Sequence, residues 1–76
     1  MYEEVDGGRC TTQSVTKEDC EVIAQEKESG FSEISDPFFP PGCYDKREFK
    51  RVYFNTHISS ANCSEERSCI CVGIGD

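Results

Sequence analysis

The chain has 76 residues and a formal net charge of −7, from 15 acidic and 8 basic side chains. A chain of this length forms a single domain. The excess of acid argues against nucleic acid as a partner and against anionic membrane surfaces, because phosphate groups are bound by clusters of Lys and Arg. No apolar run is long enough to cross a membrane, so a membrane-spanning protein is not expected.

Six cysteines are the most informative feature of the sequence. An even number in so short a chain predicts a disulfide framework and an oxidising compartment. The cysteines stand at Cys10, Cys20, Cys43, Cys63, Cys69 and Cys71. They can pair in many ways, and we favour a local loop clasp between Cys63 and Cys69, which leaves the other four to tie helix and sheet together. The core is otherwise small, so these bonds are expected to be required for folding.

The chain divides into an arm, a domain and a tail. Residues 1–8 are expected to form a flexible N-terminal arm, 9–72 the disulfide-stabilised domain and 73–76 a tail. A first short strand is expected at about 9–12. The first six residues are acidic and polar and do not resemble an export signal, so we expect a mature chain or a domain of a longer precursor.

The clearest element is a helix over about 17–28. Thr16 and Asp19 resemble a capping box, which marks the start of a helix. Gly30 is expected to end the helix in a left-handed conformation. One face of the helix carries an apolar stripe, which is expected to be buried with its cysteine pointing inward. The stripe consists of Cys20, Ile23 and Ala24.

The remaining elements are extended. The proline-rich segment 32–41 is expected to be a loop. A β-hairpin is expected from strands at about 42–44 and 49–54, and a last short strand at about 69–72. The fold class is therefore a small disulfide-rich α+β domain, with one helix packed on a short antiparallel sheet.

Aromatic residues are the candidate binding residues. Phe38 and Phe39 lie between prolines in the loop, and we expect one to cap the core and the other to be an exposed anchor. In the strand at 49–54, alternation places Tyr53 with Phe49 and Arg51, opposite Val52 and Phe54. Both faces carry an aromatic ring, so the second face is either covered or exposed for contact.

The order of these segments resembles a small cysteine-rich module of secreted and membrane-attached proteins of algae and other protists. The resemblance rests mainly on the Pro-Pro-Gly-Cys-Tyr run and on the Cys-Ile-Cys ending, and it covers about residues 9–72. It implies an extracytoplasmic setting but no activity. The matching residues are Cys10, Thr16 to Ala24, Pro40 to Tyr44, Val52 to Thr56, Cys63 and Cys69-Ile70-Cys71.

Catalytic and metal chemistry find little support in the sequence. The cysteines lack the paired knuckles of zinc sites, iron–sulfur spacings and a redox Cys-x-x-Cys. His57 is the sole histidine and lies in a polar loop, without the nucleophile and orienting acid that catalysis needs. We therefore expect no enzyme, no cofactor and no metal. Asn62-Cys63-Ser64 fits the glycosylation pattern, although a bridged middle cysteine would hinder its use.

Three functions remain open from the sequence. The first is a non-catalytic binding or structural subunit that docks on a larger extracytoplasmic or lumenal protein assembly through Phe38, Phe39 and Tyr53. The second is a secreted effector, such as a signal, a toxin or a protease inhibitor. The third is a carbohydrate-recognition module built on Tyr44, Tyr53 and the 55–62 loop. The expected location is an oxidising compartment, either secreted or at the cell surface, or an organelle lumen such as the thylakoid.

Overall fold

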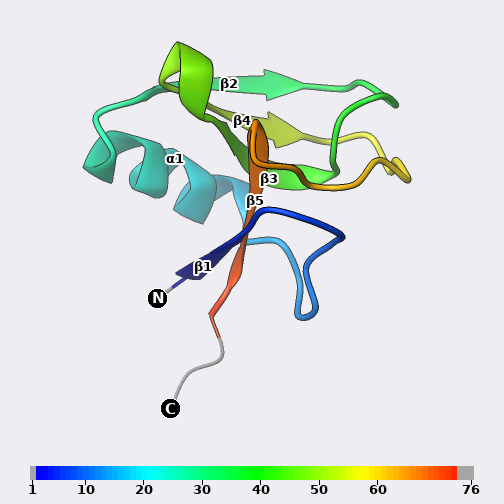
Figure 1. The fold of residues 1–76 in the computed structure, drawn as a ribbon. Helices are drawn as coiled ribbons and strands as arrows, with labels where there is room; N and C mark the ends of the chain where they lie inside the picture. Colours follow the sequence, from blue (N-terminus) through cyan, green and yellow to red (C-terminus); the bar gives the residue numbers. More distant parts are fainter. Residues whose placement is uncertain (1, 74–76) are drawn as a thin grey trace.

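The structure is a computed structural model that describes residues 2–73. These residues form a five-stranded mixed sheet with one α-helix on one face (Figure 1). The strand order is β1-β5-β3-β4-β2; β2 and β4 are parallel and the other pairs antiparallel. The elements are β1 (Tyr2–Val5), α1 (Lys17–Glu26), β2 (Gly30–Ile34), β3 (Gly42–Lys46), the 3-10 helix η1 (Arg47–Phe49), β4 (Arg51–Asn55) and β5 (Arg67–Val72).

Helix α1 begins where the capping residue predicts. The Thr16 hydroxyl accepts a hydrogen bond from the Asp19 N–H at 3.2 Å, which satisfies one of the free donors of the first turn. The expected apolar stripe is buried against the sheet. The expected end of the helix is wrong: the left-handed residue is Glu28, with φ 56°, and Gly30 already pairs with β4 as the first residue of β2.

The sheet is larger than the sequence indicated. Tyr2–Val5, expected in the N-terminal arm, form the edge strand β1 on β5. No strand forms at residues 9–12, and the segment expected to be a loop from residue 32 begins inside β2. The parallel pairing of β2 with β4 was not expected, because the chain between them passes through a loop and the antiparallel strand β3, and only the tertiary structure brings the two strands together. Of the expected tail, residues 74–76 lie outside the described residues.

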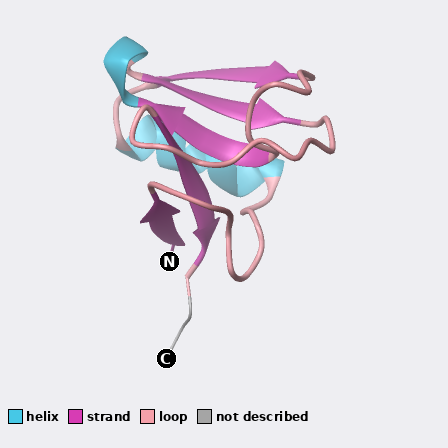
Figure 2. Cartoon of the chain, turned by 45° about the vertical axis from the view of Figure 1, so that its right-hand side comes forward, coloured by secondary structure: helices cyan, strands magenta, loops and turns pink. Residues whose placement is uncertain are grey.

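The two faces of the sheet differ in what covers them. Cys43, Val52 and Ile70 point toward α1, and with the helix stripe they form the larger core cluster. The alternate residues of the same strands point away from the helix, which lies behind the strands in Figure 2. A smaller core cluster of Cys63, Cys69 and Cys71 covers the second face at the end formed by β5.

The three disulfides are divided between these two faces. Cys20–Cys43 joins α1 to β3 on the helix side. On the other face, the Cys10–Cys71 and Cys63–Cys69 bonds fasten the flanking loops to β5. The expected Cys63–Cys69 clasp is therefore confirmed, and the other four cysteines do tie the helix and the loops to the sheet. Three such bonds are consistent with an oxidising environment.

A partly buried ion pair fastens β1 to the helix. The Lys27 ammonium lies 2.7 Å from Glu4 and 3.4 Å from Asp45. Burial by itself lowers the pKa of Lys27. The hydrogen bond to Glu4 and the negative charges of Glu4 and Asp45 raise it, and their combined effect is larger, so the pKa lies above its ordinary value. This contact explains how an acidic N-terminal segment without a strong strand pattern is held at the edge of the sheet.

Candidate binding face of the sheet

The face of β3 and β4 that points away from the helix carries two stacked tyrosines. Tyr44 and Tyr53 are cross-strand partners, and their ring centroids lie 5.3 Å apart with planes inclined at 25°. Tyr44 is buried, whereas Tyr53 is half-buried. The disulfide loops cover only one end of this face, and the tyrosine pair lies in the uncovered part.

A depression of about 380 Å³ lies over these tyrosines. Its walls come from four separate parts of the chain: the end of β2 with the following turn, the loop before β3, η1, and the start of β5. An opening of this size fits one or two side chains of a partner. The lining residues are Ile34, Ser35, Asp36, Phe39, Tyr44, Lys46, Phe49, Tyr53 and Arg67.

The Phe39 ring forms one wall of the depression. Its centroid lies 6.3 Å from that of Tyr44, and the guanidinium of Arg67 lies 4.6 Å above the ring. On another wall, the Lys46 ammonium lies 5.1 Å from the centre of the exposed Phe49 ring. Both cations are thus placed over aromatic faces, an arrangement that favours a fixed side-chain position.

The loop that carries Phe39 is held by a buried amide. The Asn55 Nδ2 group donates to the carbonyl oxygens of Asp36, Phe39 and Pro40 at 2.8, 3.0 and 3.1 Å. Its Oδ1 atom accepts from the backbone N–H groups of Asp36 and His57 at 3.0 and 3.1 Å. The Ser59 hydroxyl also donates to the Phe39 carbonyl oxygen, at 2.5 Å. A non-repetitive loop is therefore held to the end of β4 mainly by Asn55, a residue that the sequence pattern did not single out.

Of the three aromatic residues predicted to bind, Phe39 and Tyr53 line the same depression. Phe38 does not line it and is 84% exposed beside it in the chain. Phe38 is the exposed ring that was expected, whereas Phe39 does not cap the core: it joins neither core cluster and packs beside Tyr44 at the open face. The binding role of all three residues stays a prediction. Phe49 and the cations Lys46 and Arg67 also line the depression and were not among the predicted residues, although strand alternation placed Phe49 on the side of Tyr53.

Burial gives Tyr44 an unusual ionisation. Burial away from solvent raises the pKa of Tyr44 from 10.0 to about 12. The charges of Tyr53 and Asp36 act in the same direction, and the positive charge of Arg67 acts against them. The folded state therefore favours the neutral phenol. Its contribution to stability is fully present below the ordinary pKa and is lost as the pH rises through the folded value.

We accordingly expect the free energy of unfolding to fall by about 2 kcal/mol between the ordinary and the raised pKa of Tyr44. Urea titrations at successive alkaline pH values measure this loss, and absorbance of the phenolate reports the ionisation itself. In Tyr44→Phe the titration step near pH 12 is absent. A step near pH 12 that persists in Tyr44→Phe contradicts the assignment.

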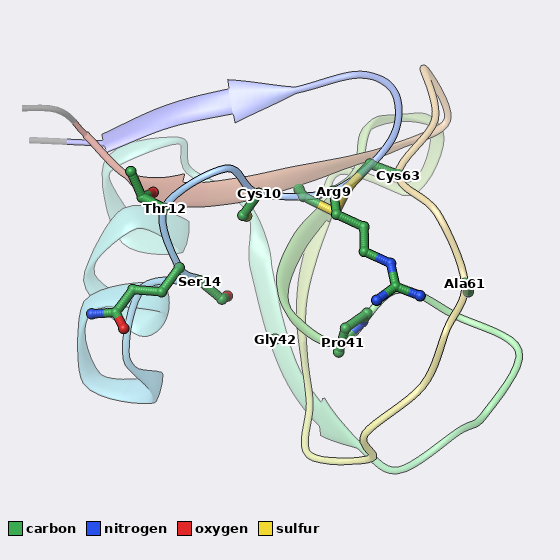
Figure 3. Close-up of a pocket in the computed structure, with 10 residues that line it drawn as sticks. Arg9, Cys10, Thr12, Ser14, Pro41, Gly42, Ala61 and Cys63 are labelled. Carbon is green, nitrogen blue, oxygen red and sulfur yellow. A yellow bond between two sulfur atoms is a disulfide. The ribbon is translucent and has the colours of Figure 1, made fainter.

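A second, smaller pocket of about 200 Å³ lies on the same face, nearer the disulfides (Figure 3). It is enclosed by the 9–14 segment, Pro41-Gly42 and the 61–63 segment, and Figure 3 shows Arg9 extending toward Pro41. Ser14 packs directly on Gly42, whose φ of 79° and lack of a side chain make room for it. None of the aromatic residues predicted to bind lines this pocket, so the larger depression is the better candidate site.

Free thiols and clusters of metal ligands are absent from the described residues. All six cysteines are in disulfides, and residues 2–73 contain no group of three or more side chains placed to hold a metal. His57 is exposed in the loop after β4. In the same part of the chain, no helix has the length and apolar character needed to cross a membrane.

Comparisons with protein-family models, with curated proteins and with solved structures find no match to the chain. The resemblance to the algal and protist module therefore stays a prediction. The fold and the geometry of the aromatic face are consequently the basis for a functional proposal.

Proposed function

We propose that the protein is a non-catalytic binding module that docks on a larger protein in an oxidising, extracytoplasmic compartment. One observation carries the proposal: an aromatic depression lies on the face of the sheet opposite the helix, in the part of that face that the disulfide loops leave uncovered. Small domains need their aromatic residues for the core, so rings kept at an open surface indicate contact with a partner.

The arrangement has the features of an interface centre. A stacked tyrosine pair forms the floor, Phe39 and the exposed Phe49 ring contribute walls, and Phe38 is exposed next to Phe39 in the chain. Aromatic anchors in pockets supply much of the energy of protein interfaces. Because the disulfides and Asn55 hold these walls, the surface loses little conformational freedom on binding, which favours affinity.

The two other functions fit this surface less well. Sugar binding by an aromatic residue needs an open ring face, but Tyr44 is only 2% exposed and stacks on Tyr53. A secreted effector that acts through an extended loop would rely on the 56–66 segment, whose largest exposed residue is Ile58. That segment contributes Ala61 and Cys63 to the smaller pocket and no residue to the larger depression, so it supports an effector function less than the sheet face supports docking.

Photo-crosslinking tests the proposal in material from the organism that makes the protein. p-Benzoylphenylalanine replaces Phe49 at the margin of the depression, and in a matched control it replaces Val22, which is 50% exposed on the outer face of α1. We expect a discrete adduct with one protein from position 49 and none from position 22. Excess unlabelled protein is expected to compete for the adduct, whereas the Phe39→Ala/Tyr53→Ala variant competes less. Equal adducts from both positions would contradict the proposal.

A further inference from the structure

Three basic side chains stand in one row across the open face. Lys46 is the cross-strand partner of Arg51 on one side and of Arg67 on the other. The Cβ atoms of directly opposed residues lie about 5 Å apart. The charged ends of the three side chains diverge from there: the Arg51 guanidinium lies over Gly30 of β2, Arg67 over the Phe39 ring and Lys46 over the Phe49 ring. The chain has almost twice as many acidic as basic residues, so three adjacent cations on one face are an unexpected arrangement. We call Arg51, Lys46 and Arg67 the cationic row.

The cationic row is only partly neutralised by the protein itself. Lys46 lies 3.4 Å from Glu48, whose side chain is mostly exposed. The Arg51 guanidinium instead donates to the Ser32 hydroxyl at 2.8 Å and to the Phe31 carbonyl at 3.3 Å. Within residues 2–73, no carboxylate forms an ion pair with Arg51 or Arg67. Two guanidinium groups therefore keep donors free for an external acid.

A group of exposed carboxylates lies on the helix side of the sheet, although Asp36 lines the depression itself and Glu48 lies beside Lys46. The outer side of α1 and the residues that follow it carry exposed carboxylates, on the face of the sheet opposite the cationic row; these are Glu18, Asp19, Glu21, Glu26 and Glu28. Charges farther apart than about 8 Å are largely screened at physiological ionic strength. An acidic group that approaches the open face is therefore little affected by the carboxylates on the helix side, and it meets the row together with Asp36 and Glu48.

The row lies beside the aromatic floor. Tyr53 and Tyr44 are two residues away from Arg51 and Lys46 along β4 and β3, which is a distance of about 7 Å on the same face. A ligand that places an acidic group over the row can therefore insert an apolar side chain into the depression. In an extended peptide, side chains two residues apart have this same spacing.

We propose that the open face binds an acidic peptide segment of the partner, with a carboxylate over the cationic row and a neighbouring aromatic or aliphatic side chain over the tyrosine pair. This inference rests on the proposed function and specifies its ligand. A peptide fits better than a nucleic acid, because three cations provide a small footprint for phosphate.

Random copolymers test the selectivity, because they sample many spacings of the two side-chain types. The probes are poly(Glu,Tyr), poly(Lys,Tyr), heparin and duplex DNA, each titrated into ¹⁵N-labelled protein at low salt. We expect poly(Glu,Tyr) to shift the amide signals of β3, β4 and the start of β5, and added salt to reverse the shifts. Poly(Lys,Tyr) is expected to affect only α1. Shifts on β3 and β4 that only heparin or DNA produces, or that both copolymers produce equally, overturn the inference.

Charge removal provides the second arm of the test. Arg51→Gln, Lys46→Gln and Arg67→Gln are expected to weaken the binding of poly(Glu,Tyr) by about two- to fivefold each. The matched control is Lys50→Gln, which removes an exposed cation adjacent in sequence but placed in the turn before β4, and which is expected to leave binding unchanged. The amide spectrum of each variant confirms that it is folded.

The two proposals fail in different ways. If the adduct from position 49 forms normally in all three row variants, the acidic ligand is wrong and the docking face stands. If the adducts from positions 49 and 22 are equal, the docking face is wrong whatever the copolymers do. Equal loss of copolymer binding in Lys50→Gln and in the row variants also overturns the inference, because it indicates a general charge effect.

Discussion

Replacing Cys20 and Cys43 together by alanine is expected to remove about 3–5 kcal/mol from the free energy of unfolding. The bond joins α1 to β3 across 23 residues, and both sulfur-bearing side chains have 0% exposure. Its loss therefore increases the freedom of the unfolded chain and also leaves a cavity between helix and sheet. A domain of this size has a comparable total stability, so we expect little folded protein at 37 °C.

The matched control is the Cys63→Ala/Cys69→Ala variant, whose bond closes only 6 residues. The shorter loop gives an expected loss of about 2 kcal/mol. Urea unfolding followed by circular dichroism compares the two variants, and amide hydrogen exchange shows which elements open. A larger loss for the control than for Cys20→Ala/Cys43→Ala is the result that contradicts this account.

The helix and the clasp could be predicted because their signals are local. Thr16 precedes an apolar stripe with helical spacing, and Cys63 and Cys69 are close enough in the chain to meet in one loop. The alternation in 49–54 likewise placed Tyr53 on the face opposite Val52, as the structure has it. Each of these inferences needs only neighbouring residues and a known repeat.

The edge strands could not be predicted because their stability comes from distant partners. Tyr2–Val5 contain two glutamates in four residues, and they are held by pairing with β5 and by the Glu4–Lys27 ion pair. The strand β2 pairs in parallel with a segment some twenty residues later, across an intervening loop and hairpin strand. Strand pairing of this kind depends on tertiary context more than on intrinsic propensity.

The same reason explains which parts of the binding face were missed. Phe39 and Tyr53 attract attention as aromatic residues in a loop and a strand. The cationic row requires the register of β3 against both β4 and β5, since Arg51, Lys46 and Arg67 are separated in the sequence. Charges that appear scattered along a chain can form a continuous site only when the sheet is assembled.

Replacing Asn55 by aspartate is expected to reduce the free energy of unfolding by about 3–5 kcal/mol at neutral pH. Asn55 is 2% exposed, and its Nδ2 group donates to three backbone carbonyls of the 36–40 loop. Aspartate has the same shape, but it replaces these donors by an ionised oxygen that faces three carbonyl oxygens. The loop therefore loses its attachment, and a buried charge is left unpaired.

The effect has a defined pH dependence. Burial and the loss of donors raise the pKa of the introduced carboxyl above its unfolded value, so the protonated form favours folding. The deficit relative to the natural protein is then expected to shrink as the pH falls, because the neutral acid regains one donor. Asn62→Asp, in an exposed position of the 56–66 loop, is the matched control and is expected to change stability by less than about 0.5 kcal/mol. Urea titrations at several pH values measure both variants.

Asn55 also connects stability to binding. Because its side chain fixes the carbonyl of Phe39, its loss is expected to release one wall of the depression before the sheet itself unfolds. Asn55→Asp should therefore weaken the binding of poly(Glu,Tyr) at urea concentrations where β3 and β4 keep their amide protection. Unchanged affinity in a variant with an unprotected 36–40 loop would show that Phe39 is not part of the binding surface, and would restrict the site to the tyrosine pair and the cationic row.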